Sequence, residues 1–274
     1  MSDMEFRRPA NLPYLECRYA HDSKARYGAH SHLTVSLGIV ESGESIVTVE
    51  QDAFHVQAGQ VVLFDAGQVH ACNPAPDQTW SYHMLYFDKS WWVAIMRELT
   101  GGDCANVTTA HPDCEPQLVQ DLIEINKALI TAPDERMAEL ELNLISLLNR
   151  LASCLQSQNA PLHRQPSPPA WFDEVRDILE TRYREPVTLE DLCRRAKVTK
   201  GPLIRQFKRH AGLTPYAFLQ NVRITHARER LAEGAVIADV AQELGFSDQS
   251  HLNRLFKRLV ASTPGHYRND LARA

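Results

Sequence analysis

Two pairs of basic residues recur at one spacing near the C-terminal end of the sequence. Arg205 and Lys208 are repeated 49 positions later as Arg254 and Lys257. A guanidinium group can bind one guanine edge through two hydrogen bonds, whereas an ammonium group suits phosphate oxygens. Side chains of these types on an exposed helix face would bind an anionic polymer. The repeat implies two similar binding surfaces.

These residues lie within a longer repeat. Residues 203–215 and 252–264 are identical at seven of thirteen positions, namely Leu203/Leu252, Arg205/Arg254, Phe207/Phe256, Lys208/Lys257, Arg209/Arg258, Thr214/Thr263 and Pro215/Pro264. Upstream the repeat continues at a shift of 48, and the one-residue slip falls where a turn is expected. Two compact helix-turn-helix copies predict two similar targets, and DNA, whose major groove recurs every helical turn, meets that requirement.

Apolar spacing predicts two helices in each copy, with Thr188, Thr199 and Ser247 as N-caps. Residues 215–233 predict a continuous helix that holds the copies at a fixed separation. Exposed Arg and Lys on one helix usually form only a solvated surface, but two joined helix-turn-helix copies favour a DNA-binding domain. The DNA-binding candidates are Lys200, Ile204, Arg205 and Lys208 in the first copy, and Gln249, Ser250, His251, Asn253, Arg254 and Lys257 in the second.

Residues 172–270 contain four extended motifs, namely Leu203-x-Arg205-x-Phe207-Lys208, Gly212-x-Thr214-Pro215, Ile237-Ala238-x-Val240-Ala241-x2-Leu244-Gly245-Phe246 and Thr263-Pro264-x2-Tyr267-Arg268. With these motifs the segment resembles the DNA-binding domain of the AraC/XylS family of bacterial transcription regulators. Ala261 departs from the family, which usually has Gly at that helix end. The resemblance implies double-stranded promoter DNA and RNA polymerase as partners, and activation rather than repression.

Three histidines in the N-terminal half have the side chains of a metal or ligand site. His30-Ser31-His32 precedes a predicted strand, and Gly59-x5-Asp65-x-Gly67-x2-His70 follows predicted hairpins. Together they resemble the two motifs of a cupin barrel, as in AraC-type sensor domains, in which the histidines bind iron, manganese or zinc with a Glu. Residues 33–40 contain no acid, and Glu41 lies in a predicted turn.

Two interpretations of these histidines stay open. His30, His32 and His70 could hold a divalent transition metal, although no cofactor is otherwise expected. Alternatively, Tyr27, His30, His32, His70, Trp80 and His83 line a pocket for an unknown small-molecule effector. Strand alternation puts His83 and Leu85 on one face and Tyr82 and Met84 on the other, without fixing which face is inward.

Short alternating segments predict strands over residues 33–40, 45–50, 53–56, 61–64 and 80–87, with a loop over residues 71–79. Leucines at helical spacing then predict two helices within residues 115–156. Their apolar faces pack either inside the monomer or against a second chain, and we expect a homodimer through this pair.

These elements predict a multidomain chain. Residues 1–156 form a mostly-β, cupin-like effector-binding and dimerisation domain with a helical pair, 157–170 a linker, and 171–274 an all-α double helix-turn-helix domain. Residues 1–170 carry 11 Lys and Arg against 21 Asp and Glu, a net charge of −10, whereas residues 171–274 carry 18 against 13, a net of +5. The basic half suits phosphates.

Other features exclude several classes. The six cysteines form no C-x-x-C pair, and neither an apolar leader nor a membrane-spanning run is visible. We therefore expect a non-enzymatic, effector-controlled transcription regulator on DNA in the bacterial cytoplasm. One alternative is a metal-dependent cupin enzyme with a vestigial C-terminal domain, and another is an architectural protein without an effector.

Overall fold

The computed structural model of the chain describes residues 4–49, 52–101, 113–156 and 167–272. These residues divide into two units, one of strands and helices and one of helices alone. The described residues of 1–26, 32–162 and 269–274 belong to the first, and those of 27–31 and 163–268 to the second. Most of the expected linker 157–170 lies outside the described residues. The β-rich N-terminal part and the all-α C-terminal part were both predicted.

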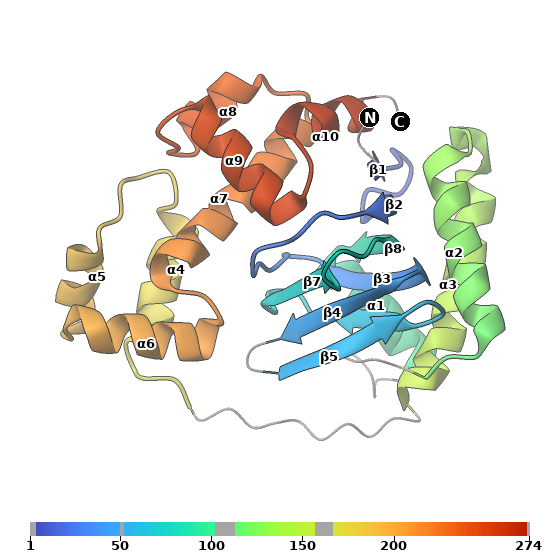
Figure 1. The fold of residues 1–274 in the computed structure, drawn as a ribbon, viewed down its shortest axis with the longest axis horizontal. Coiled ribbons are helices and arrows are strands. Elements are labelled where there is room, and N and C mark those ends of the chain that lie inside the picture. Colours follow the sequence, from blue (N-terminus) through green and yellow to red (C-terminus); the bar gives the residue numbers. More distant parts are fainter. Residues whose placement is uncertain (1–3, 50–51, 102–112, 157–166, 273–274) are drawn as a thin grey trace. The chain divides into compact units, whose positions relative to one another are not determined.

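The β unit contains two antiparallel sheets (Figure 1). The five-stranded sheet has the order β1 (Met4–Arg7), β2 (Leu15–Ser23), β8 (Trp80–Phe87), β3 (Val35–Ser42) and β6 (Val61–Phe64). The three-stranded sheet has the order β5 (Asp52–Gln57), β4 (Glu44–Val49) and β7 (His70–Pro74).

Strand β7 occupies a segment for which the sequence predicted a loop. It pairs with β4 in a register that runs from Val49 opposite His70 to Ser45 opposite Pro74. Pro74 is tolerated because it ends an edge strand, where a missing N–H breaks no ladder. The prediction of a loop was wrong because Asn and Pro weaken the local strand signal, while the pairing partner lies far away in the sequence.

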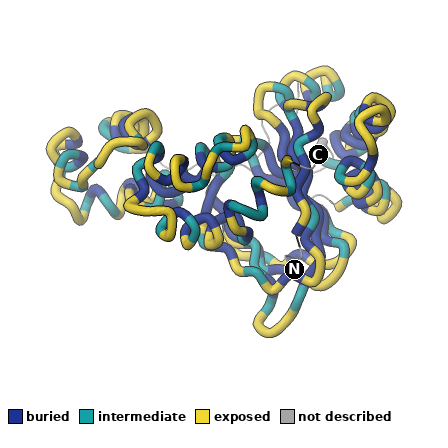
Figure 2. The backbone as a smooth tube through the Cα atoms, turned by 90° about the horizontal axis from the view of Figure 1, so that it is seen from above, coloured by how far each residue is buried: buried dark blue, intermediate teal, exposed yellow. Residues whose placement is uncertain are grey.

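Alternation along β8 gives the five-stranded sheet two different faces. Leu85 and Phe87 join Leu37 and Ile39 in one apolar core with the helices, so this face is covered by α1 (Lys89–Thr100), α2 (Pro116–Thr131) and α3 (Met137–Gln156). Tyr82, Met84 and Tyr86 point to the opposite face. All eight residues of β8 are nonetheless buried. Figure 2 shows the contrast between buried and exposed residues along the backbone.

The predicted helical pair is present as α2 and α3, joined by the short 3-10 turn Asp134–Arg136. Their regularly spaced leucines are buried in the core of the β unit, namely Leu118, Leu122, Leu129, Leu140, Leu144, Leu148 and Leu151. Arg150 of α3 pairs with Asp121 and Glu115 at 2.5 and 2.6 Å. Of the two packing alternatives, the structure therefore uses this apolar face inside the monomer, while Leu142 remains 70% exposed.

The helical unit contains seven helices in its described part. These are α4 (Phe172–Thr181), α5 (Leu189–Ala196), α6 (Lys200–Ala211), α7 (Pro215–Ala232), α8 (Ile237–Glu243), α9 (Gln249–Val260) and α10 (Pro264–Leu271). The pairs α5/α6 and α8/α9 are the two predicted helix-turn-helix copies, and α7 connects them as expected.

The two copies end their second helices with different residues in the same backbone conformation. Gly212 follows α6 with φ 72°, and Ala261 follows α9 with φ 58°. Both lie in the left-handed region, which costs an L-residue about 1–2 kcal/mol. Ala261, the departure from the family noted in the sequence, is therefore strained.

Exchanging these caps should change stability in opposite directions. We expect Ala261→Gly to raise the free energy of unfolding by roughly 0.5–1 kcal/mol, because relief of strain exceeds the added entropy of the unfolded glycine. Gly212→Ala should lower it by about 1 kcal/mol, because an alanine there takes on the same strain. Urea unfolding of the full chain, followed by circular dichroism, measures both changes. Destabilisation by Ala261→Gly would contradict the assignment of strain.

Candidate DNA interface and ligand site

The first copy is held together by capping and by a compact core. The Thr188 side chain accepts a hydrogen bond from the N–H of Asp191 at 3.1 Å, as predicted. Leu192, Leu203 and Phe207 are buried with α4 and α7 residues in one core. Thr199 is the N-cap residue of α6, but its side chain makes no capping hydrogen bond, so that part of the prediction was wrong.

The second copy has the same construction with a different cap. Asp248, not Ser247 as predicted, caps α9 by accepting from the N–H of His251 at 2.7 Å. Ser247 donates to the Asp248 carboxylate at 3.0 Å instead. Asp248 is the stronger acceptor because it is charged, and a negative charge suits a helix N-terminus.

The predicted recognition faces are accessible in both copies. Arg205 and Lys208 of α6 are exposed, and so are Arg254 and Lys257 of α9. The remaining candidates are exposed or half-buried, namely Lys200, Ile204, Gln249, Ser250, His251 and Asn253. Each second helix thus presents an Arg and a Lys one turn apart on its solvent side, as major-groove reading requires.

Lys200 differs from the other candidates because it already has an anionic partner. Its ammonium group pairs with the Glu190 carboxylate of α5, which raises the pKa of Lys200 and lowers that of Glu190. Both side chains are exposed, so the pair stabilises the fold very little. A phosphate could therefore replace Glu190 as the partner at low cost.

In the β unit, His32 and His70 come together on the ligand face, by which we mean the side of β8 that carries Tyr82, Met84 and Tyr86. The His32 ring lies 5.3 Å from that of His70 and 5.0 Å from that of Tyr86. His70 also stacks on Phe64 at 3.9 Å. The N–H of Gly67 donates to the His32 carbonyl at 2.7 Å, which joins the two predicted histidine motifs.

The protonation of these histidines follows from their hydrogen bonds. Nδ1 of His70 faces the Gln68 carbonyl at 2.9 Å, and Nδ1 of His30 faces the Gly28 carbonyl at 2.8 Å. A nitrogen beside a carbonyl must carry the proton, so Nε2 is the basic nitrogen of each neutral ring. Burial lowers the pKa of His70 to about 4, which keeps it neutral near pH 7.

The three predicted metal-ligating histidines form one cluster. The nearest ring nitrogens of His30, His32 and His70 all lie within 4.8 Å of one another. Each histidine on a zinc ion places its ligating nitrogen about 2.0–2.1 Å from the metal, so nitrogens that share one zinc lie closer together than 4.8 Å. Small side-chain movements would bring the three histidines into that arrangement. Glu41 supplies no fourth ligand, because its carboxylate pairs with Lys127 of α2 and faces His83.

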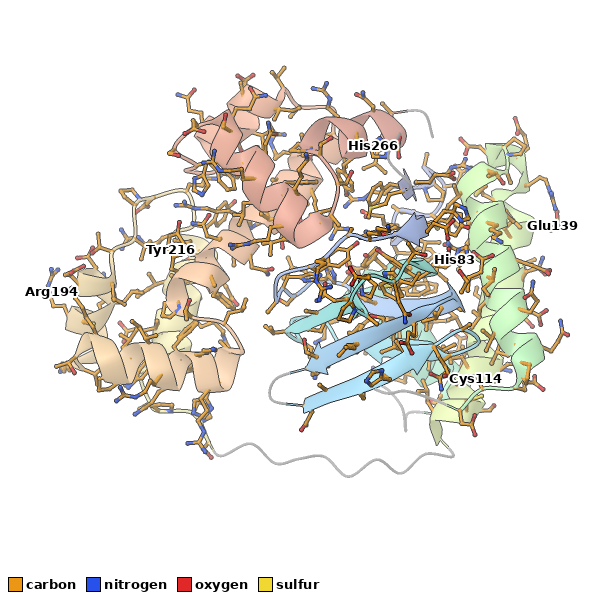
Figure 3. All side chains as sticks on the ribbon, viewed as in Figure 1. His83, Cys114, Glu139, Arg194, Tyr216 and His266 are labelled. Carbon is orange, nitrogen blue, oxygen red and sulfur yellow. The ribbon has the colours of Figure 1, made fainter. Side chains whose placement is uncertain are left out.

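The other predicted effector residues lie in different surroundings. Trp80 stacks on Tyr82 at 4.0 Å, and Tyr27 lies 5.7 Å from the His30 ring within the segment Tyr27–Ser31. His83 lies on the helix-covered face of β8 instead and is fully buried (Figure 3). There it contacts Asn126 of α2, so the structure separates it from His32 and His70.

Sequence reasoning missed several side chains of the ligand face. Arg18 of β2 is 4% exposed, donates to the Tyr82 hydroxyl at 2.8 Å and lies 5.2 Å from the Phe6 ring. Tyr86 and Phe64 flank the histidines. Tyr82 and Tyr86 alternate with His83 and Leu85 in a predicted strand, which was the available signal, but no strand was predicted for β2.

Comparisons with known proteins agree with both halves of this description. Residues 12–153 match the AraC-like ligand binding domain, and residues 192–270 match a helix-turn-helix domain. The chain belongs to the AraC family of transcription regulators. It is 28% identical over 231 residues to the uncharacterized HTH-type transcriptional regulator YbfI of Bacillus subtilis, covering 83% of this chain and 82% of YbfI.

Two further similarities extend over nearly the whole chain. The HTH-type transcriptional activator RhaS of Escherichia fergusonii is 24% identical over 267 residues, which is 94% of each chain. The fold is similar to that of an apo variant of ToxT from Vibrio cholerae, with a TM-score of 0.63, 15% identity, and coverage of 94% of this chain and 98% of the ToxT chain. ToxT has also been solved with (E)-4-(8-methylnaphthalen-1-yl)but-3-enoic acid bound.

Family membership decides between the classes that the sequence left open. The AraC-like N-terminal domain is a ligand-binding domain, and the C-terminal domain binds DNA. The alternative of a metal-dependent cupin enzyme with a vestigial C-terminal domain is therefore wrong. No helix among the described residues is long and apolar enough to cross a membrane.

The recognition faces predict distinct effects of two substitutions in α9. Arg254→Ala should weaken binding to a site selected from random DNA by about 1–3 kcal/mol, and relax base preference at one position. Lys257→Ala should weaken specific and random DNA alike, and reduce the slope of log affinity against log salt by about 1. Fluorescence anisotropy at several salt concentrations measures both effects.

Arg194→Ala is the matched control for these variants. Arg194 is also exposed, at 76%, but it belongs to α5 and pairs with Asp191 at 3.1 Å (Figure 3). Its loss should leave affinity within about two-fold. Equal binding of selected and random DNA by the wild type and by Arg254→Ala would contradict specific recognition through this helix.

The environment of His83 predicts a pH-dependent stability. Asn126 donates to Nδ1 of His83 at 2.8 Å and to the Arg18 carbonyl at 3.0 Å, so Nδ1 accepts and cannot be protonated without losing this bond. Nε2 faces Glu41 at 3.4 Å. Burial lowers the pKa of His83 to about 4 despite Glu41, which raises it, while Lys127 lowers it further.

The sign of the pH effect follows from the two states. The pKa of His83 is about 6.5 in the unfolded chain and about 4 in the folded chain. Between these two pH values, only the unfolded chain binds a proton at His83. Stability from this group is therefore complete above pH 6.5 and decreases as the pH falls towards 4, by at most about 3 kcal/mol. His83→Gln should flatten the dependence measured by urea unfolding between about pH 7.5 and about pH 4.5. An unchanged slope would contradict the buried neutral state of His83.

Proposed function

We propose that this chain activates transcription by binding promoter DNA through both helix-turn-helix copies, under the control of a small molecule bound in the N-terminal ligand-binding domain. The observation that supports the DNA half is the matched pair of exposed recognition helices, each with an Arg and a Lys one turn apart. RhaS, similar over nearly the full length, is named an activator, which supports the sign of control. RNA polymerase is the expected protein partner.

The ligand half rests on the grouping of His30, His32 and His70 beside aromatic rings. Because Nδ1 of His30 and Nδ1 of His70 each bond a backbone carbonyl, Nε2 of these rings is the nitrogen that can accept a hydrogen bond from a ligand. Tyr86 and Phe64 provide apolar surfaces. Such a lining suits a small organic molecule with several polar groups. A divalent transition metal held by the three histidines is the second candidate ligand.

The segment Tyr27–Ser31 provides a physical basis for control. It is counted with the helical unit, and Asn221 of α7 donates to the Ser31 carbonyl and hydroxyl at 3.1 and 3.0 Å. The N–H of Ser31 donates in return to Asn221 at 3.1 Å. Because His30 precedes Ser31 in the same segment of the helical unit, a ligand that moves the His30 ring would act on the bonds to α7.

Dimerisation through α2 and α3 is part of the proposal. The main apolar face of α2 and α3 is buried inside the monomer, so a dimer contact would use the apolar side chains that remain on the surface of this pair. Leu142 is exposed and Ile145 is half-buried on α3, at a spacing that puts them on one side of the helix.

A ligand screen tests the proposed control. A panel of sugars, organic acids and aromatic acids is screened for compounds that raise the melting temperature of the wild type but not of His32→Ala. Such a compound should change the affinity for selected DNA at least several-fold. Asn221→Ala should still bind the compound, yet its DNA affinity should no longer respond.

Metal analysis of protein purified without chelator completes the test. About one metal per chain, lost in a His30→Ala/His70→Ala variant, would identify the ligand as a metal. If neither a compound nor a metal changes DNA affinity, control by a ligand at these histidines is wrong, although DNA binding would stand.

A further inference from the structure

Arg223 is a buried cation in the helix that connects the two DNA-reading copies. It lies at the middle of α7 and is 7% exposed. Its side chain therefore cannot serve as a DNA contact like the exposed arginines of α6 and α9. A buried guanidinium requires hydrogen-bond acceptors for its five N–H groups. The acceptors around Arg223 therefore identify the segments that it connects.

The partners of Arg223 come from both halves of the helical unit. Nε donates to the Tyr183 carbonyl at 2.7 Å, and Nη2 donates to the Glu185 carbonyl at 3.1 Å. Both carbonyls belong to the segment between α4 and α5, directly before the first copy. Nη1 donates to the Gly245 carbonyl at 2.6 Å, in the turn of the second copy. One side chain thus ties the backbones of the two copies together.

The backbones approach closely at this point. Gly245 has φ 75°, and a Cβ built there would lie 2.8 Å from the Arg184 carbonyl oxygen and 2.9 Å from Nη2 of Arg223. Only glycine therefore fits between the second turn and the segment before α5. The Phe246 ring lies 6.0 Å from the guanidinium. Burial lowers the pKa of Arg223, but a guanidinium remains charged at any physiological pH.

A second, exposed link crosses the same seam. Arg184 of the first half pairs with Glu243 at the end of α8 at 3.3 Å, and Glu243 also pairs with Arg230 of α7 at 3.1 Å. These pairs join solvent-accessible arginine side chains to the half-buried Glu243 and contribute little to stability. The three charge-assisted bonds of Arg223 are part-buried and point in fixed directions, so they define the geometry of the seam.

We propose that Arg223 is a positioning residue that fixes the separation and mutual orientation of α6 and α9, and thereby the base-pair spacing that the protein accepts between its two target segments. This inference rests on the proposed sequence-specific binding by both copies. Lysine cannot replace Arg223, because an ammonium group is a point donor and cannot hold three carbonyls arranged around a planar fork.

The test compares DNA duplexes that differ only in spacing. Full-length wild type first selects a two-segment site from random DNA. Affinities are then measured by fluorescence anisotropy for that site, for versions with one or two base pairs inserted or deleted between the segments, and for a duplex that keeps one segment alone. The wild type should lose at least ten-fold on insertion or deletion.

Arg223→Lys should change how affinity depends on the spacing between the two segments, and not simply weaken binding to every duplex. We expect affinity for the selected site to fall at least ten-fold, affinity for the one-segment duplex to stay within about three-fold, and the penalty for altered spacing to shrink. Gly245→Ala, which pushes a methyl group into the same seam, should give the same pattern. Arg230→Lys is the matched control on the same helix and should retain the wild-type spacing penalty.

Three results would overturn the inference. One is an equal loss of affinity by Arg223→Lys for one-segment and two-segment DNA, with an unchanged penalty for altered spacing. That result would mean that Arg223 contributes only to the stability of the fold. Another is wild-type affinity in both Arg223→Lys and Gly245→Ala. The third is a wild type that tolerates every spacing. The proposed function fails separately, if no specific site is selected at all. Melting temperatures identify a variant that does not fold, in which case the other variant decides.

Discussion

Short helical pairs cannot bury their apolar faces alone, and this constraint organises the helical unit. Both copies pack on α7, whose buried residues extend from Pro215 at its start to Leu231 in its last turn. Leu219 joins the core that contains Leu203 and Phe207 of the first copy. The separation of the recognition helices is therefore a property of α7 and of what is bonded to it, and neither copy sets it alone.

The β unit shows a comparable division, because strand β8 serves two faces. Leu85 and Phe87 anchor the sheet to the helices, while Tyr86 on the other face contacts His32. His83 belongs to the helix side, where Asn126 of α2 fixes its tautomer. The α2 and α3 leucines are buried on the helix side, whereas on the ligand face aromatic rings lie beside His32 and the neutral imidazole of His70. We propose that the small-molecule ligand is recognised on this face.

Much of the helical unit could be predicted because its signals are local. The period of Leu203 and Phe207, repeated in Leu252 and Phe256, is set by the helix itself. The N-cap residues were harder to predict. Ser247 and Asp248 can both accept a hydrogen bond at the start of α9, and only the backbone geometry of the structure shows that Asp248 does so. The β unit was harder, because strand pairing is non-local: β7 depends on β4, and β1 and β2 had no sufficient local pattern. The position of His83 depended on which sheet face the helices cover, and no alternating pattern contains that information.

Helix α7 also links the two proposals physically. Asn221 holds Ser31, and Arg223 holds the carbonyls of Tyr183 and Gly245. Because they are two residues apart on a helix, these side chains point about 160° apart, so one faces the segment beside the histidines and the other faces the seam between the copies. A rotation or shift of α7 that releases Asn221 necessarily moves Arg223. Ligand control of this kind would act by changing the spacing between two recognition helices, without altering either recognition surface.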